Sequence, residues 1–268
     1  MRDNVVRADG RGEGLGARCC CAMVPAEDFS IRLLDPHESA LVVDAIRAIY
    51  GDSYDVPWLY DTTEIAHRLA HGQMVSGAAF APDGSLLCHA ALTRHDHDDQ
   101  VVHSGQAVSL PAARGQHLFT RVKEHLASWS RDRGILGIYS EATAAHPYSQ
   151  KANLDLGATE TGVLLAWIPA SVDNDASVLA TPTRASVVLF YLRTNRAPGH
   201  PVYAPPSHRE MVRTVIDRAG LRGGLATAGR RQTLPTHTRV HTEVDPTHNV
   251  AIVHVREAGE DLADVART

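Results

Sequence analysis

The sequence predicts an α/β fold: a mixed central sheet, antiparallel at its front and flanked by helices on both faces, with a smaller α/β half-domain at the C-terminal end. Two patterns predict it. Residues 74–80 and 85–93 alternate as two strands around Pro82-Asp83-Gly84, which is a hairpin turn signal. Residues 101–129 then run as strand, turn and helix, and residues 135–169 as strand, helix and strand, an order that favours a sheet covered by helices.

Composition excludes several classes of protein. With 268 residues the chain can bury a large core, as one long domain or two short ones. A formal net charge of −5 with 21% charged residues implies no polybasic surface, and a dedicated nucleic-acid binder would be unusual with that balance. No apolar run approaches the roughly 20 residues of a membrane span. We therefore expect neither nucleic-acid nor membrane partners.

Residues 1–28 are expected to form a flexible leader, because they are rich in Gly, Arg and Ala and have no hydrophobic periodicity. They lack the apolar core of a signal peptide, and Met23 is an alternative start. Three of the four cysteines are adjacent, Cys19 to Cys21, and the fourth is Cys88. Adjacent cysteines do not make a disulfide framework, so we expect a cytoplasmic protein.

The first elements are a strand at residues 31–34 and a helix that begins at Asp35-Pro36 and presents apolar residues inward as far as Ile49. The loop that follows, residues 50–61, is dense in tyrosine and carries acidic neighbours. Two interpretations stay open: the loop is a lid over a substrate, or it is a plug in the core. Residues 64–71 predict a second helix.

The connection at residues 94–100 contains His95-Asp96-His97 and further aspartates. Two imidazoles one residue apart can reach a single metal ion, which suggests a metal site. A hairpin tip is normally polar and solvated, however, and the sequence supplies no third ligand from a framework. We therefore predict a solvated loop and no metal.

The central stretch combines a strand, a turn and a helix. Residues 101–110 form the strand, Pro111 ends it, and Arg114-Gly115-Gln116-His117 form the turn. The helix shows one apolar face made of Leu118, Val122, Leu126 and Trp129. The first N–H groups of a helix have no intrahelical partner, so this junction is a generic anion site. Arg114 adds a cation, and Gly115 allows close backbone approach.

At these residues the chain resembles the GCN5-related N-acetyltransferase (GNAT) superfamily. Members carry a strand, a loop patterned Arg/Gln-x-x-Gly-x-Gly/Ala, and a helix whose N-terminus holds the coenzyme A pyrophosphate. Arg114 fits the first position, whereas His117 and Phe119 stand where the family's glycines usually lie. Residues 135–169 continue the resemblance as strand, helix, Leu-Gly and strand. The resemblance implies a GNAT-like domain at residues 29–195.

The resemblance also implies a co-substrate, acetyl-CoA or another acyl-CoA, and no metal. The strand end would align the acyl-pantetheine arm like an added strand, with a backbone N–H near Val108 polarising the thioester. The loop and helix start would hold the pyrophosphate. The implied cofactor-binding residues are Ala107, Val108, Ser109, Leu110, Arg114, Gly115, Gln116, His117, Leu118, Phe119 and Asn153.

For catalysis, the best base candidate is Glu141, which lies near the end of the predicted strand at residues 135–140, where the family's central strands splay apart. The alternative is a Glu satisfied by a neighbouring Arg or at a strand edge. The family's usual general acid is a Tyr four residues before the Gly of the Leu-Gly pair, and here that position is Asn153. The substitute candidates lie just upstream and are Tyr148, His146 and Ser149; each could equally cap the helix or pack. Gln106 can orient a substrate or water but cannot take a proton. His89 and His103 lie among apolar neighbours, which favours structural, hydrogen-bonded histidines.

After residue 170 the composition becomes polar and small, which is typical of a linker. Residues 186–192 are a strong strand that fits the last position of the GNAT sheet. Residues 210–221 predict a helix, and residues 238–244 and 249–256 predict two strands. We interpret residues 196–268 as a degenerate GNAT-like half-domain that covers the acceptor side or forms a homodimer.

The sequence therefore predicts an N-acyltransferase that moves an acyl group, taken to be acetyl, from a coenzyme A thioester to an amine. Two alternatives stay open: a carrier-protein thioester as donor, because the loop has lost two glycines, and a non-catalytic GNAT-like binding or regulatory module. The acceptor is expected to be a small-molecule amine, and its identity is open. The acidic net charge favours a cationic one.

Overall fold

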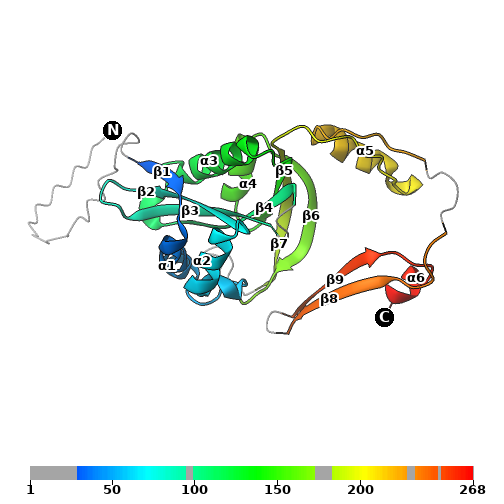
Figure 1. Cartoon of the computed structure of the whole chain (residues 1–268), viewed down its shortest axis with the longest axis horizontal. Helices are drawn as coiled ribbons and strands as arrows, with labels where there is room; N and C mark the ends of the chain where they lie inside the picture. Colours follow the sequence, from blue (N-terminus) through cyan, green and yellow to red (C-terminus); the bar gives the residue numbers. More distant parts are fainter. Residues whose placement is uncertain (1–28, 95–98, 173–182, 228–232, 247–248, 268) are drawn as a thin grey trace, which may run out of the picture.

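A computed structural model describes residues 29–94, 99–172, 183–227, 233–246 and 249–267 (Figure 1). The predicted leader, the Cys19 to Cys21 triplet, the His95-Asp96-His97 motif and most of the linker after residue 170 lie outside these ranges. Within them, seven strands form one mixed sheet in the order β1-β2-β3-β4-β5-β7-β6. The strands are β1 (Ser30–Leu33), β2 (Met74–Phe80), β3 (Leu86–Thr93), β4 (Val101–Ser109), β5 (Gly137–Thr143), β6 (Thr159–Ile168) and β7 (Ala185–Arg193).

The sheet is mixed, as predicted. Strands β1 to β4 pair antiparallel in sequence order, β4 and β5 pair parallel, and β7 lies antiparallel between β5 and β6. The predicted strand at residues 186–192 therefore does belong to the sheet. It also lengthens β5: pairing with β7 continues through Glu141, Ala142 and Thr143, so β5 ends three residues beyond the predicted Ser140. Glu141 consequently lies inside a strand.

Helices cover both faces of the sheet (Figure 1). α1 (Ser39–Tyr50) and α2 (Thr62–Ala70) lie on one face, with η1 (Pro36–Glu38) and η2 (Pro57–Tyr60) beside them. α3 (Leu118–Asp132) and α4 (Tyr148–Asp155) lie on the other, and η3 (Pro111–Ala113) precedes α3. We call these the α1 face and the α3 face.

Alternation along the strands supplies each face with its own core. On the α3 face Cys88, Ala90 and Leu92 of β3 pack with Val122 and Leu126 of α3. Gly77 lets α3 approach β2: a Cβ there would lie 3.1 Å from Leu126 Cγ. On the α1 face, Ala78, Ala91 and Val108 pack with the fully buried Val42, Ile46, Leu59 and Ile65.

The C-terminal region contributes η4 (Pro206–His208), α5 (Arg209–Arg218), a separate two-stranded sheet of β8 (Arg239–Asp245) and β9 (Val250–Glu257), and α6 (Leu262–Val265). α5 docks on β6, where Arg218 pairs with Glu160 at 3.2 Å and Thr159 donates to the Arg218 carbonyl at 3.1 Å. Division of the chain at residue 195 and a GNAT-like origin of this region stay predictions. No helix in the described ranges is both long and apolar enough to cross a membrane.

Candidate functional site

The site begins where β4 and β5 separate. The two strands pair in parallel from Val101–Gly137 to Ser104–Ser140, and no later pair joins them within the described residues. Beyond that point β4 keeps β3 as its partner and β5 keeps β7. We call this divergence the fork. An unpaired strand edge offers backbone N–H and C=O groups to a ligand that can add itself as a strand.

A β-bulge shapes the β4 side of the fork. The register with β3 shifts between His89 and Ala91, and the opposing Gln106 adopts a φ of 48°. His89 stabilises this bulge: its Nδ1 lies 2.8 Å from the Gln106 carbonyl oxygen, and its Nε2 contacts the Ser76 hydroxyl. Burial lowers the pKa of His89 to about 4, so the ring is neutral and Nδ1–H donates. The predicted structural role of His89 is confirmed.

The bulge also decides which amides face the fork. The Leu110 N–H donates to the Leu87 carbonyl of β3 at 2.9 Å. Directly opposite residues of antiparallel strands alternate between hydrogen-bonded and non-bonded pairs, so the N–H of Val108, paired with His89, also points to β3. The same alternation directs the N–H of Ser109 away from β3, toward the fork. The polarising role of an amide near Val108 stays a prediction.

Glu141 is the first β5 residue beyond the fork, and Trp167 holds its carboxylate. The indole Nε1–H of Trp167 donates to Glu141 Oε2 at 3.0 Å. Trp167 reaches it because the end of β6 is bulged between Leu164 and Ile168, with Ala166 at a φ of 52°. Arg184 holds this bulge through its Nε, which donates to the Ala166 carbonyl at 2.7 Å.

The surroundings favour the protonated form of Glu141. Burial raises its pKa above the usual 4.5, the Trp167 hydrogen bond opposes this, and the nearby negative charge of Asp55 adds to the rise. A carboxylate with a raised pKa is a stronger base than a free one, which suits proton abstraction near neutral pH. The hydrogen bond to this carboxylate comes from an indole, and Glu141 lies on the edge of β5 that opens beyond Ser140, so its catalytic role stays a prediction.

The tyrosine-rich loop after α1 reaches the same place. Burial raises the pKa of Tyr54 well above 10, and the same side chain interacts with the Gln106 backbone and with the charges of Asp55 and Glu141. The loop is also well packed: Tyr60 accepts from the Tyr54 N–H at 3.0 Å and donates to the Gly51 carbonyl at 2.9 Å. The packing of the loop on the α1-face core supports the predicted plug, and the lid over a substrate stays a prediction.

On the α3 face, the polar residues form a separate cluster. Asn153 of α4 is buried, and its Oδ1 accepts from the Ser140 hydroxyl at 3.1 Å and from Lys123 Nζ. Ser104, the β4 partner of Ser140, is buried beside them. Burial lowers the pKa of Lys123 to about 8. Asn153 was predicted to contact the cofactor, whereas Lys123 was missed.

The missed lysine did leave a signal. Lys123 follows Val122 and precedes Leu126 by three positions, which places it at the margin of the apolar face of α3. Lysine at such a position usually extends its amine to water. Only the placement of α4 against α3 shows that the amine is enclosed, and that placement depends on contacts 30 residues apart in sequence.

The substitute acid candidates lie at the start of α4. Tyr148 is the first residue of the helix and is 76% exposed, and its ring packs against that of His146 with centroids 5.3 Å apart. Their catalytic role stays a prediction.

The α3 N-terminus has the predicted strand-turn-helix geometry. Gly115 has a φ of 78°, and the helix N-cap, His117, is left-handed with a φ of 55°. The His117 side chain is exposed, so it does not fill the space before the helix. Phe119 is half-buried and packs on the α3-face core, with Lys123 Nζ 5.5 Å from its ring centre. The first N–H groups of α3 are thus available in the arrangement that suits an anion.

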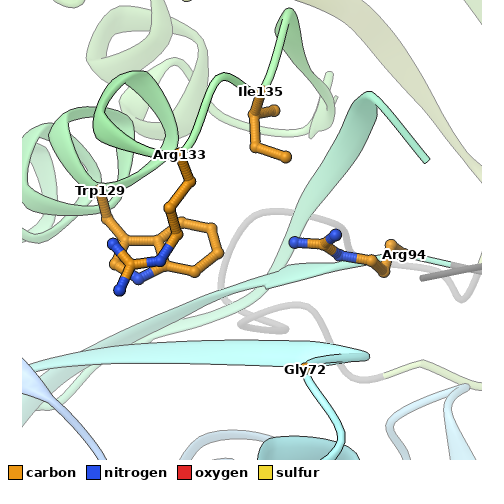
Figure 2. A pocket seen from close by; sticks show the side chains of 5 residues that line it. All are labelled: Gly72, Arg94, Trp129, Arg133 and Ile135. Atoms are coloured by element: carbon orange, nitrogen blue, oxygen red, sulfur yellow. The ribbon is translucent and has the colours of Figure 1, made fainter. Parts of the chain in front are cut away.

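Two other features of the surface lie away from the fork. A pocket of about 280 Å³ at the C-terminal end of α3 is lined by Gly72, Arg94, Trp129, Arg133 and Ile135 (Figure 2). The Arg133 guanidinium lies over the Trp129 ring at 4.5 Å. This pocket adjoins the paired end of β4 and β5, and none of the predicted site residues lines it.

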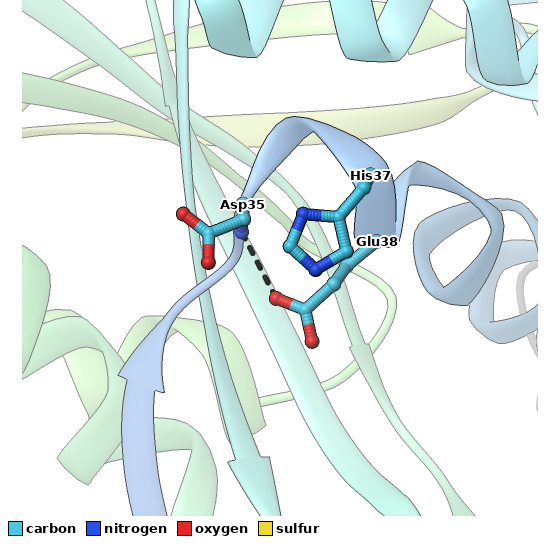
Figure 3. Close-up of side chains that lie close together, drawn as sticks. All are labelled: Asp35, His37 and Glu38. Atoms are coloured by element: carbon cyan, nitrogen blue, oxygen red, sulfur yellow. Dashed lines mark hydrogen bonds between the residues drawn. The ribbon is translucent and has the colours of Figure 1, made fainter.

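Asp35, His37 and Glu38 come close enough together to suggest a cation site (Figure 3). The Glu38 carboxylate is already engaged, however. It accepts from both terminal nitrogens of Arg32, at 2.6 and 2.7 Å, and from the Asp35 N–H at 3.0 Å. The Arg32 hydrogen bonds lower the pKa of Glu38 to about 2. The cluster is therefore an ion pair that caps the first helical turn.

Comparison with solved structures identifies the architecture. Variant forms of the spermidine/spermine N-acetyltransferase SpeG from Vibrio cholerae match with a TM-score of 0.50 at 11% identity, over 63% of this chain and 95% of theirs. A putative acetyltransferase, yncA from Salmonella typhimurium, solved with acetyl-CoA, matches at 0.49 and 15% identity over 67% and 98%. A GCN5-related N-acetyltransferase from Kribbella flavida matches at 0.47 and 16% over 62% and 98%.

No protein-family model matches the sequence, and no curated protein matches it. At these low identities the likeness concerns the fold. The part of the chain from β1 to β7 therefore has the fold of these N-acetyltransferase structures.

Proposed function

We propose that this protein is an N-acyltransferase that moves an acyl group, taken to be acetyl, from a coenzyme A thioester to an amine. The observation that carries the proposal is the fork, with Glu141 at its first open position on the α1 face. A donor lying along β4 brings its thioester beside that carboxylate. The solved structures of similar fold are described as acetyltransferases, which supports the same class of reaction.

The donor is held by backbone groups of β4 and by the α3 N-terminus. The amide and carbonyl groups of pantetheine pair with the open β4 edge at Ala107 and Ser109. The pyrophosphate lies against the first N–H groups of α3, with Arg114 as the nearby cation. Gln106 supports occupation of the fork: its buried Oε1 has no hydrogen-bond partner within the described structure. A buried acceptor of this kind costs free energy until a ligand or water donates to it.

Glu141 takes a proton from the attacking amine, directly or through one water. The amine nitrogen forms a bond with the acyl carbon, and the N–H groups that face the fork stabilise the negative charge on the carbonyl oxygen. The carbon–sulfur bond then breaks, and its electron pair leaves with sulfur. Trp167 keeps the Glu141 carboxylate oriented throughout.

The acceptor is an amine that arrives as a cation. Asp55 and Glu141 give its site two carboxylates, and Tyr54 with Trp167 gives it aromatic surface. Ammonium groups are attracted both to carboxylates and to aromatic faces. A small aliphatic amine fits these groups better than an anionic or neutral acceptor.

Isothermal titration tests the donor half of the proposal. We expect acetyl-CoA and desulfo-CoA to bind in the micromolar range and pantetheine, which lacks the pyrophosphate, to bind at least tenfold more weakly. Arg114→Ala should weaken binding of the two nucleotides and leave pantetheine unchanged, because Arg114 meets only the pyrophosphate. Arg131→Ala is the matched control, since Arg131 is an exposed arginine at the other end of α3.

The outcomes separate the alternatives. Equal affinity for pantetheine and acetyl-CoA would favour a carrier-protein thioester, which has the pantetheine arm without the nucleotide. Absence of binding to all three would favour a non-catalytic module. If acetyl-CoA binds, release of free thiol with a panel of aliphatic amines identifies the acceptor.

A further inference from the structure

Lys123 is placed unusually for a lysine. It lies on α3 and is only 7% exposed, so its amine is largely enclosed by protein. In the part of the chain that the structure describes, Nζ donates to the Asn153 Oδ1, a neutral acceptor, and no carboxylate forms an ion pair with it. Buried charges are normally paired. An amine enclosed without a counter-charge therefore requires an explanation beyond packing.

The contacts of Asn153 connect this amine to the fork. The same Oδ1 that accepts from Lys123 also accepts from Ser140 at 3.1 Å, and Ser140 is the last β5 residue paired with β4. Its partner Ser104 is buried on the same face. The amine thus lies within two hydrogen bonds of the point where the strands separate, on the α3 face.

Strand alternation places the base on the opposite face. Ser140 and Glu141 are consecutive β5 residues, so their side chains point to opposite faces of the sheet. Glu141 meets Tyr54, Asp55 and Trp167, whereas Ser140 meets Asn153 and, through it, Lys123. A thioester that passes through the fork would have its acyl carbon toward Glu141 and its sulfur toward Lys123.

We propose that Lys123, oriented by Asn153 and Ser140, protonates the thiolate that leaves during acyl transfer. The inference rests on the proposed function. The amine nitrogen gains a bond to the acyl carbon and loses a proton to Glu141, the carbon–sulfur bond breaks, and its electron pair stays on sulfur. Sulfur then takes a proton from the Lys123 ammonium. The products are the amide and the free thiol, and the proton held by Glu141 replaces the one lost by Lys123 through solvent.

The neighbours of Lys123 leave its amine free to exchange a proton. On α4, Tyr148, Lys151 and Asp155 are exposed, and Lys151 pairs with Asp155. On α3 itself, Glu124 is exposed. The titratable side chains of the strands beside it point to the other face: Tyr139 and Glu141 of β5, His103 of β4, which packs on Tyr139, and Tyr191 and Arg193 of β7, which lie opposite Tyr139 and Gly137.

Burial lowers the pKa of Lys123 to about 8, so the amine is mostly charged at neutral pH and still gives up its proton readily. A donor of this strength matches a thiol, whose ordinary pKa is roughly 8.5. Proton transfer between groups of similar pKa is efficient in either direction.

The test titrates the thiol of bound coenzyme A, which requires no knowledge of the acceptor. Ultraviolet absorbance of the thiolate is followed against pH for free CoA and for CoA in saturated complexes with the wild type, Lys123→Met and Lys123→Arg. In the wild type we expect the bound thiol to ionise about one pH unit below the free thiol. Lys123→Met should remove this shift, and Lys123→Arg, which keeps the charge, should retain it.

Turnover measurements then distinguish whether Lys123 donates a proton or only supplies a positive charge. Consumption of acetyl-CoA is measured through the free thiol that it releases. The acceptor is spermidine as the amine probe, or the best amine of the screen. Lys123→Met and Lys123→Arg should both lower kcat about 10²-fold, because Arg does not release a proton in this pH range. The alkaline limb of the kcat profile should disappear in both. Lys151→Met, an exposed lysine on α4, is the matched control and should change nothing.

The failure of this inference differs from the failure of the proposed function. If CoA binds but its thiol ionises alike in the wild type and Lys123→Met, Lys123 is not beside the sulfur and the inference is wrong, while the proposed function stands. If Lys123→Arg turns over as fast as the wild type, the residue supplies charge and not a proton. If CoA does not bind to the wild type, the proposed function itself fails, and this inference falls with it.

Discussion

At the fork, the two faces of the sheet present groups of opposite charge: a carboxylate, Glu141, on the α1 face and an amine, Lys123, on the α3 face. On the α1 face, Glu141 is an acidic group that meets aromatic side chains and another carboxylate. On the α3 face, Ser140 is connected through Asn153 to Lys123, which has no carboxylate partner among the residues that the structure describes. Burial shifts both pKa values toward the neutral form, upward for Glu141 and downward for Lys123. The sheet between them prevents the ion pair that would remove both shifts.

One strand, β5, can thus carry a base on one face and help to position an acid on the other. Side chains of neighbouring strand residues point to opposite faces, so two groups can be close along the chain and still be electrostatically separate. A base and an acid in direct contact would exchange their proton and pair. The predictions below test whether the two faces act separately, in order of decreasing expected effect.

The largest effect is expected from the α1 face. Glu141→Gln keeps the shape and the Trp167 contact but cannot accept a proton, so kcat/KM should fall by about 10² to 10⁴-fold. Steady-state thiol release at neutral pH measures it. Glu124→Gln, an exposed carboxylate on α3, is the control. A loss of less than threefold in Glu141→Gln would mean that another group takes the proton.

The second effect concerns stability on the α3 face. At pH 7 the folded protein keeps a buried ammonium whose pKa is displaced from 10.5 to about 8, which corresponds to about 3 kcal/mol of destabilisation at most. Lys123→Met should therefore raise the free energy of unfolding at pH 7 while it lowers activity. Denaturant titration measures the gain.

The size of this effect depends on pH. Between pH 8 and 10.5 the unfolded chain holds more protons at Lys123 than the folded one, so wild-type stability at this site rises with pH. The advantage of Lys123→Met should shrink over that window and vanish above it. A variant that is less stable than the wild type at pH 7 would indicate that Lys123 is a structural residue.

The third prediction concerns the bulge on β4. The pKa of His89 is lowered from 6.5 to about 4, so the unfolded chain binds the proton first as the pH falls. The stability contributed by neutral His89 is present above pH 6.5 and is lost between pH 6.5 and 4, by about 3 kcal/mol at most. Urea unfolding at a series of pH values measures it.

His89→Gln should flatten this pH dependence, although its stability at pH 7 is lower. His67→Gln, an exposed histidine of α2, should leave the pH dependence unchanged. An equally steep loss in His89→Gln would assign the acid sensitivity to other groups.

The smallest effect is expected from removing the hydrogen bond that Trp167 donates to Glu141. The Trp167 N–H stabilises the ionised carboxylate, so Trp167→Phe should raise the Glu141 pKa further. If Glu141 is the base, activity requires its ionised form and falls as the pH drops through this pKa. The acidic limb of the kcat/KM profile should move up by about one pH unit, since a charge-assisted hydrogen bond contributes about 1.5 kcal/mol. An unmoved limb would mean that Glu141 is not the titrating base.

Much of the fold was predictable because its signals are local. The hairpin around Pro82-Asp83-Gly84, the apolar face of α3 and the strand at residues 186–192 all depend on periodicity or on turn residues within a few positions. The structure confirms each of them. The end of β5 was placed three residues early because the partner that extends it, β7, follows about 45 residues later in the chain.

The candidate site, too, was predictable only in part. Glu141, Gln106 and Asn153 were candidates because of their places on predicted strands and on the helix that became α4. Trp167 and Tyr54 were not placed beside Glu141, because a bulge in β6 and a folded loop bring them there. Lys123 was missed because its enclosure depends on α4.

The sequence by itself determined the order and type of the elements, since helix and strand periods, turn residues and helix starts are written in neighbouring residues. Only the tertiary structure decided where β4 and β5 separate, which face each polar group occupies, and which groups lose water. Those properties set the pKa values of Glu141 and Lys123. They depend on burial and on contacts between residues far apart in the chain, and no local pattern encodes the low dielectric surroundings that shift a proton equilibrium.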